Sequence, residues 1–161
     1  MFSGSLALDE KAIQIIDGYH NSPEIIFNGN QPFYLPNIDT VTMPVMPQNT
    51  KFYWLLFHEL IHSTGAIYRL NRIIFQHFKE RNVEEFNKLY CCEEMTAHLG
   101  SKMLLEYCGM FDDDLFVYDW IAYYQNRISV AEAKMAHNEA VNAFEFLIGR
   151  QNFSNSNKTQ G

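Results

Sequence analysis

The chain has 161 residues, enough for one domain with a sizeable core, and its 47% apolar and 15% aromatic content is that of a folded globular protein. Twelve Lys and Arg against 19 Asp and Glu give a net charge of −7, which argues against phosphate-driven binding of nucleic acid. No apolar run approaches the roughly 18–20 residues that span a bilayer, and the N-terminus lacks the features of a signal peptide. We therefore expect one cytoplasmic domain over residues 1–150, with neither nucleic acid nor a membrane as its partner.

The first third of the chain predicts one helix and a small antiparallel or mixed sheet. Residues 9–19, DEKAIQIIDGY, carry apolar residues at helical spacing, and the following NSP ends the helix. Three short extended stretches follow, separated by Asn, Gly and Pro: EIIFNG at 24–29, PFYLP at 32–36 and TVTMPV at 40–45. Because Pro44 cannot donate to a β-ladder, the third stretch is predicted to be an edge strand or the end of a strand.

The rest of the chain predicts helices. Prolines disappear after Gln48, and helical patterns cover residues 50–64, 83–108, 113–128 and 130–148, with an irregular connection over 65–82. A small sheet followed by several helices is an α+β arrangement. The polar residues 151–161 are predicted to be a disordered tail. The basic residues of the connection are interpreted as a solvated face: Arg69, Arg72, Lys79 and Arg81.

The three cysteines do not predict a disulfide or a metal site. Cys91, Cys92 and Cys108 are odd in number and form no CxxC pair, so we expect reduced thiols on a helix. Cys91 and Cys92 are adjacent on that helix and point in different directions, which disfavours shared zinc ligation. Three histidines without partner spacing are predicted to lie at the surface: His20, His77 and His137.

The helix predicted over 50–64 carries charged and ionisable side chains inside an apolar run, FYWLLFHELIHSTG. His58 and His62 lie one turn apart on the same face, so they can occupy two corners of a tetrahedral metal ion. Glu59 is rotated by about 100° and can reach a water molecule at that ion as a general base, which is the HExxH arrangement. A metal would also offset the roughly 2–7 kcal/mol cost of burying an unpaired polar group. The alternative is two buried histidines that bond to carbonyls or water.

A third ligand is expected from the helix predicted over 83–108, because catalytic zinc sites hold three protein ligands and one open position. Phe86, Tyr90, Glu94 and His98 recur every four residues along one line, so Glu94 faces inward and is predicted to be that ligand. Glu93 lies on the neighbouring line and is predicted to be solvated. His98 is predicted to orient a ligand, with direct ligation by His98 as the alternative.

Taken in order, the motifs of this chain resemble the zincin-like metallopeptidase domain of ArdC-type antirestriction proteins and of phage and plasmid polyvalent proteins. The resemblance covers roughly residues 20–148 and rests on PFYLPNIDTVTMP, FHELIHSTG, RLNR, EEMTAHLG and YDWIAYY. In gluzincin-like relatives the third ligand begins a Glu-x-x-Ala-acid pattern. That pattern falls on residues 94–98 and favours Glu94 over Glu93, although the acidic position is His98 here.

The resemblance implies a zinc-dependent metallopeptidase that acts on a selective protein or peptide substrate in a mobile-element or host-defence setting. His58, His62 and Glu94 would hold Zn²⁺, and Glu59 would be the catalytic general base. The implied alternative is a non-catalytic module that keeps the metal and inhibits a defence protein. Retention of Glu59 favours the enzyme, since a structural metal site needs no general base.

Zincins align the substrate along an edge strand beside the active-site helix, and residues 39–45 are the candidate for that strand. The alternative is that this stretch is a structural edge strand only. A further group should stabilise the oxyanion, and the sequence does not choose among four tyrosines: Tyr34, Tyr68, Tyr123 and Tyr124.

Overall fold

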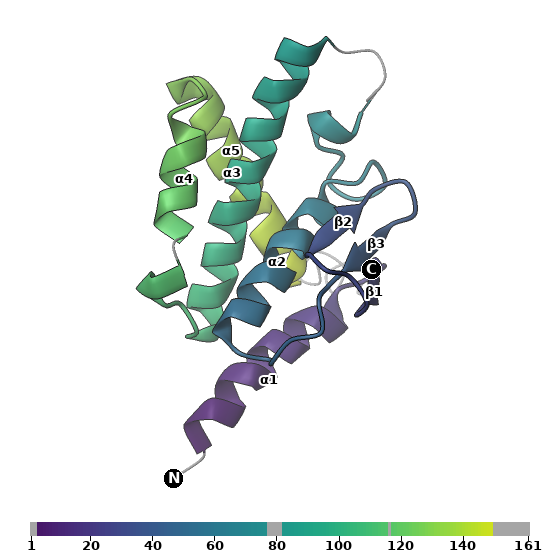
Figure 1. Ribbon diagram of the computed structural model, residues 1–161, viewed down its shortest axis with the longest axis vertical. Coiled ribbons are helices and arrows are strands. Elements are labelled where there is room, and N and C mark those ends of the chain that lie inside the picture. Colours follow the sequence, from purple (N-terminus) through teal and green to yellow (C-terminus); the bar gives the residue numbers. More distant parts are fainter. Residues whose placement is uncertain (1–2, 77–81, 116, 150–161) are drawn as a thin grey trace, which may run out of the picture.

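A computed structural model of the protein describes residues 3–76, 82–115 and 117–149 (Figure 1). One helix is followed along the chain by three short strands and then by the remaining helices. This order confirms the α+β arrangement. The predicted tail over 151–161, together with His77, Lys79 and Arg81, lies outside the described residues. The elements in order are α1 (Ser3–Gly18), β1 (Glu24–Ile26), β2 (Phe33–Leu35), β3 (Thr40–Thr42), α2 (Thr50–Thr64), η1 (Ile73–Phe75), α3 (Val83–Cys108), η2 (Asp113–Leu115), α4 (Val117–Gln125) and α5 (Val130–Leu147).

The sheet is mixed and has the order β1-β3-β2. Strand β3 pairs in parallel with β1, where Ile25 faces Val41, and antiparallel with β2, where Tyr34 faces Val41. Of the two alternatives predicted from Pro44, the edge strand is wrong, because β3 is the central strand, and the end of a strand is confirmed. Pro44 lies beyond the last residue of β3 and does not interrupt its ladder. The edges of the sheet are β1 and β2.

Helices α2 and α3 begin and end at local capping signals. The side chain of Asn49 accepts a hydrogen bond from the Phe52 N–H at the start of α2, and Asn82 accepts one from the Glu85 N–H at the start of α3. Gly109 ends α3 with a positive φ of 71°, a conformation that favours glycine. The predicted bounds of these two helices are confirmed.

A close approach of α2 and α3 positions the functional site. A Cβ atom on Gly100 would lie 2.7 Å from Ile61 Cδ1, so a larger residue there would force the Ile61 side chain to shift. Helix α3 also contacts α4 and α5, whereas β2 and β3 pack against α2. In Figure 1 the sheet and α4 accordingly lie on different sides of the α2–α3 pair, and α5 passes behind α3.

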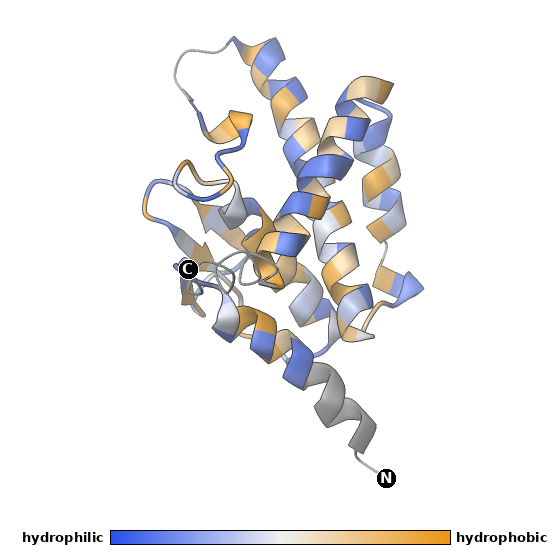
Figure 2. Cartoon of the chain, turned by 180° about the vertical axis from the view of Figure 1, so that it is seen from behind, coloured by the Kyte–Doolittle hydropathy of each residue, from blue (hydrophilic) through white to orange (hydrophobic). Residues whose placement is uncertain are grey.

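The core lies between the sheet, α2 and α3. In Figure 2 the helices carry both hydrophobic and hydrophilic residues, as expected for helices with one buried side. The largest fully buried side chains include Met43 beside the sheet, Leu56, Phe57 and Leu60 on α2, and Leu104 on α3. A smaller cluster joins α3, α4 and α5: Met95, Tyr124 and Ala136.

Two predicted helices differ in extent from those observed. The helix predicted over 9–19 begins at Ser3, and the one predicted over 113–128 is the short η2 followed by α4. The prediction for α5 is confirmed within one residue, and a capping box of Ser129 and Glu132 marks its start. Within the described part of the chain, no helix has the length and apolarity to cross a membrane. The free thiols Cys91, Cys92 and Cys108 lie on α3, as predicted.

Candidate metal centre

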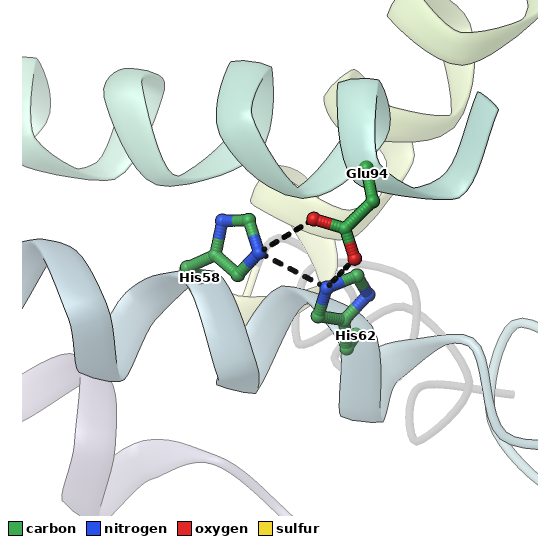
Figure 3. A group of neighbouring side chains, drawn as sticks. All are labelled: His58, His62 and Glu94. Carbon is green, nitrogen blue, oxygen red and sulfur yellow. Dashed lines mark hydrogen bonds and ion pairs between the residues drawn. The ribbon is translucent and has the colours of Figure 1, made fainter. Parts of the chain in front are cut away.

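The predicted ligands His58, His62 and Glu94 converge between α2 and α3 (Figure 3). The two histidine Nε2 atoms lie 3.1 Å apart. Glu94 approaches them with one oxygen each, Oε2 at 3.3 Å from His58 Nε2 and Oε1 at 3.2 Å from His62 Nε2. All three side chains are largely buried, with 11–14% of each side chain exposed. The spacing of four along α2 and the inward direction of Glu94 thus bring together the three residues that the sequence singled out.

The donor atoms fit a small tetrahedral cation. Zn–N and Zn–O bonds of about 2.0–2.2 Å at tetrahedral angles separate neighbouring donors by roughly 3.3 Å. The two histidine nitrogens, 3.1 Å apart, are close to that edge, and each lies 3.2–3.3 Å from a different Glu94 oxygen. One donor atom from each residue lies within 4.8 Å of the other two. Two imidazole nitrogens at 3.1 Å also need a proton or a cation between them, because facing lone pairs repel each other. Two histidines and one carboxylate are a common ligand set of catalytic zinc sites.

Glu93 is buried, so the prediction of a solvated Glu93 is wrong. Only 5% of the residue is exposed, and its Oε1 lies 3.0 Å from His62 Nδ1. When His62 donates its Nδ1 proton to Glu93, its Nε2 keeps the lone pair that a metal needs. Glu93 therefore orients His62, the kind of role that the sequence analysis gave to His98.

Arg72 compensates the buried charge of Glu93, and the interpretation of Arg72 as part of a solvated face is also wrong. Its guanidinium forms a two-pronged pair with Glu93, Nε to Oε2 at 2.8 Å and Nη2 to Oε1 at 2.6 Å. The same group donates to the Thr64 hydroxyl and to the carbonyls of Ile61 and His62. Arg72 therefore binds the last turn of α2 and the middle of α3 at once.

Arg69, the other arginine assigned to a solvated face, is likewise engaged in the structure. Only 2% of its side chain is exposed. Its guanidinium donates to both carboxylate oxygens of Asp39, at 2.8 and 2.7 Å, and to the carbonyls of Ser63 and Asn21. Arg69 therefore ties the turn between β2 and β3 to the end of α2.

Two carboxylates make the environment of His62 strongly negative. Burial by itself lowers the pKa of His62, but hydrogen bonds to Glu93 and Glu94 outweigh it and raise that pKa to about 10. Burial likewise raises the pKa of Glu94, and the hydrogen bonds from His58 and His62 reverse this and hold it well below its ordinary value. The cluster thus favours a positive charge at its centre, which either a proton or a metal ion supplies.

The predicted general base Glu59 lies beside the cluster and is oriented by the sheet. Its Oε2 accepts a hydrogen bond of 2.8 Å from the backbone N–H of Tyr34 on β2. The outer edge of β2, not β3, therefore faces the site. Tyr34 is itself anchored, because its hydroxyl donates to Asp39 at 2.9 Å.

An open cavity of about 420 Å³ adjoins the centre and is lined by His58, Glu59 and Glu94 on one side and by His98, Trp54, Trp120 and Tyr124 on the other. Of the four tyrosines considered for oxyanion stabilisation, Tyr124 alone lines it. Sequence reasoning did not single out Trp54 and Trp120, although the spacing of four between Trp54 and His58 offered a signal.

His98 lies next to Glu94 and is held by rings more than by hydrogen bonds. Its Nε2 is 4.0 Å from Glu94 Oε2, and its Nδ1 has no hydrogen-bond partner among the described residues. Its ring centroid is 4.4 Å from that of His58. Burial lowers the pKa of His98 to about 2, so the ring is neutral. His20 and His137 are exposed, as predicted.

The chain is similar in sequence to a known protein family and to a known protein. A family model described as zincin-like metallopeptidase matches residues 14–135. The chain is also 29% identical over 129 residues to the DNA primase TraC of Escherichia coli, a match that covers 73% of this chain and 8% of that protein.

Two crystal structures of the antirestriction protein ArdC from the R388 plasmid share the fold. The Mn(II)-bound form aligns with a TM-score of 0.61 at 25% identity, over 86% of this chain and 51% of that one. The metal-free form aligns with a TM-score of 0.58 at 25% identity, over 87% and 48%. The chain therefore spans about half the length of ArdC and a small part of TraC.

Proposed function

The chain belongs to the zincin-like metallopeptidase family, and from this we propose that it hydrolyses peptide bonds with a metal ion held by His58, His62 and Glu94. The convergence of one donor atom from each of these three residues within 4.8 Å of one another, next to an open cavity, is the observation that carries the proposal. When bound, such an ion lowers the pKa of a water molecule toward ~7 and polarises a carbonyl group.

Glu59 would act as the general base. It lines the cavity next to His58 and Glu94, and the Tyr34 N–H engages only its Oε2, which leaves Oε1 for the attacking water. Glu59 would accept the proton of that water and deliver it to the nitrogen of the leaving amine. Tyr124 is our candidate to donate to the developing oxyanion, because it lines the same cavity.

The substrate backbone would lie along β2. This strand is an edge of the sheet, and its outer side borders Glu59. An extended peptide can add to such an edge through main-chain hydrogen bonds. We infer that His98 helps to orient Glu94 by packing beside it, one helical turn along α3.

We propose zinc as the metal, from the ligand set of two imidazoles and one carboxylate. The structural neighbour ArdC binds Mn(II), and this donor set also accommodates that ion. Activity should therefore be measured with each metal in turn. Zinc should restore hydrolysis after chelation at lower free concentration than Mn(II), since affinities follow the order Mn²⁺ < Zn²⁺.

The biological substrate we propose is a selective protein partner in a mobile-element or host-defence setting, because a structural neighbour is an antirestriction protein. The same neighbour favours a second candidate, a non-catalytic metal-containing module that acts by binding a defence protein. The two candidates differ in what they require of Glu59: the enzyme needs its carboxylate, whereas the binding module does not.

Glu59→Gln separates these functions. Zinc-loaded wild type and variant would be incubated with casein and with a bacterial host lysate, and new peptide N-termini counted by mass spectrometry. We expect Glu59→Gln to keep its metal and to lose cleavage by about 10²–10⁴-fold, the usual contribution of a general base. Equal cleavage by the two proteins would contradict the assignment of Glu59. If Glu59→Gln keeps the full biological effect of wild type in cells, the result would favour the binding module.

A further inference from the structure

The cavity beside the metal centre has an aromatic wall, and the proposed chemistry does not use its two tryptophans, Trp54 and Trp120. Three helices build it at helical spacing: Trp54 precedes His58 by four residues on α2, and His98 follows Glu94 by four on α3. Helix α4 adds Trp120 and Tyr124, again four apart, so both point to the same side of that helix.

The rings of this wall are stacked on one another. The His98 and Trp120 rings lie 5.9 Å apart and are almost parallel at 4°, and the His98 and Tyr124 rings lie 5.7 Å apart at 25°. Trp54 continues the group at 6.4 Å from His98. The four rings therefore form a mostly apolar wall, whose polar atoms include Trp54 Nε1 and His98 Nδ1, both without a hydrogen-bond partner among the described residues.

Part of this surface remains exposed. Trp120 is 44% exposed although it lies in the stack and lines the cavity. A large aromatic side chain at the mouth of a cavity loses accessible surface when a ligand enters, and such residues often dominate binding energy. The wall is therefore well suited to an apolar ligand group.

The charged groups of the cavity are already engaged. Glu94 contacts both histidines, and Glu59 accepts the Tyr34 N–H. A basic side chain entering along the wall would leave water, and the carboxylate oxygen available to it is Glu59 Oε1, which the proposed mechanism needs for the attacking water. An acidic side chain would face Glu59 and Glu94 at close range. A flat, uncharged group meets neither cost.

We propose that this wall selects substrates with an aromatic side chain at a residue next to the scissile bond. The selectivity rests on the proposed function, since the wall begins at the metal ligands: one turn of helix separates Trp54 from His58 and His98 from Glu94. An aromatic ring placed there would stack offset on Trp120 while the adjacent peptide bond reaches the centre.

Ligand binding in this cavity can be followed by the protein's own tryptophan signals. Its only two tryptophans, Trp54 and Trp120, both line the wall, so each of the two indole N–H signals in an NMR spectrum comes from the cavity. The zinc-loaded Glu59→Gln protein would be titrated with acetyl-Gly-Phe-amide, acetyl-Gly-Ala-amide and acetyl-Gly-Lys-amide. Burial of a phenyl group predicts about 10- to 100-fold tighter binding of the first than of the second, with both indole signals shifted. Equal affinities, or tighter binding of the lysine peptide, would overturn the proposal.

A matched pair of variants on α4 tests the wall itself. Trp120→Ala should remove most of the preference for phenylalanine over alanine, and Trp120→Phe should restore part of it. Tyr118→Ala is the control, because Tyr118 is similarly exposed at 53% and does not line the cavity. Retention of the full preference in Trp120→Ala would overturn the proposal.

The two proposals fail in different ways. Aromatic preference in binding without any cleavage by the wild type would refute the proposed peptidase and leave the selective wall standing. Cleavage of peptides without regard to aromatic residues would refute the wall and leave the peptidase standing.

Discussion

The two sides of the metal cluster are built on different principles. On the His62 side, Glu93 and Arg72 are both at least 95% buried. They form six hydrogen-bonded contacts with α2 and with each other, one of which fixes the His62 imidazole. On the His58 side, the neighbours are rings, and an open cavity of about 420 Å³ adjoins the cluster. The closed side holds the ligand geometry, whereas the open side leaves surface for a substrate. A change on the first should cost stability and metal affinity, and one on the second should change selectivity.

Arg72→Ala should have the largest effect on the closed side. It leaves the buried Glu93 carboxylate without its cation, which typically costs about 3–5 kcal/mol of unfolding free energy. Urea unfolding followed by circular dichroism measures this loss. The control is Lys88→Ala, because the pair of Lys88 with Glu84 is well exposed and such pairs contribute at most ~0.5 kcal/mol. Similar losses in the two variants would remove the distinction between the two sides.

Glu93→Gln should weaken metal binding by about 10- to 100-fold, the usual effect of losing a partner that orients a histidine ligand. The amide can still contact Arg72, so the folded protein should remain available for the measurement. Competition with a chromophoric zinc chelator gives the affinity. Glu85→Gln, an exposed glutamate on the first turn of the same helix, is the control. An affinity equal to that of wild type would mean that Glu93 stabilises the fold only.

The site residues that sequence reasoning found are those that follow from the geometry of a single helix. A spacing of four puts His58 and His62 on one face, and the aromatic line of α3 turns Glu94 inward. Glu93 and Arg72 were misassigned because their burial depends on each other. Arg72 follows the end of α2 by eight residues. It reaches Glu93 on α3 only when the connection after α2 folds back against that helix. No local pattern of the sequence records that contact.

The sheet illustrates the same limit. The three extended stretches were correctly predicted, but their order was not. The position of β3 between β1 and β2 results from a parallel pairing of Ile25 with Val41, which has no short-range signature comparable to a hairpin turn. As a result, the proposed function assigns the alignment of the substrate to β2 and not, as the sequence had led us to expect, to residues 39–45.

Asp39→Asn should have a smaller, pH-dependent effect on how β2 is held. Burial alone raises the pKa of Asp39, but hydrogen bonds from Arg69, Tyr68 and Tyr34 outweigh it and hold that pKa below its ordinary value. The carboxylate therefore stabilises the fold at pH above its unfolded pKa of roughly 3.9, and this contribution is lost as pH falls through the lower folded value. Asparagine tolerates the positive φ of 49° at this position.

The expected loss for Asp39→Asn is on the order of 1–2 kcal/mol at pH 7, and the difference from wild type should shrink below about pH 4. Urea unfolding at several pH values measures it. A difference that stays constant over this range would show that the Asp39 charge does not contribute.

The most direct test of the centre is the zinc content of the purified, untagged protein by plasma mass spectrometry, in wild type, Glu94→Ala and the exposed control Glu85→Ala. We predict about one zinc ion per chain in wild type and in the control, and its loss in Glu94→Ala. Zinc retained in Glu94→Ala, or no zinc in wild type after dialysis against the metal, would contradict the assignment of His58, His62 and Glu94 as the ligands.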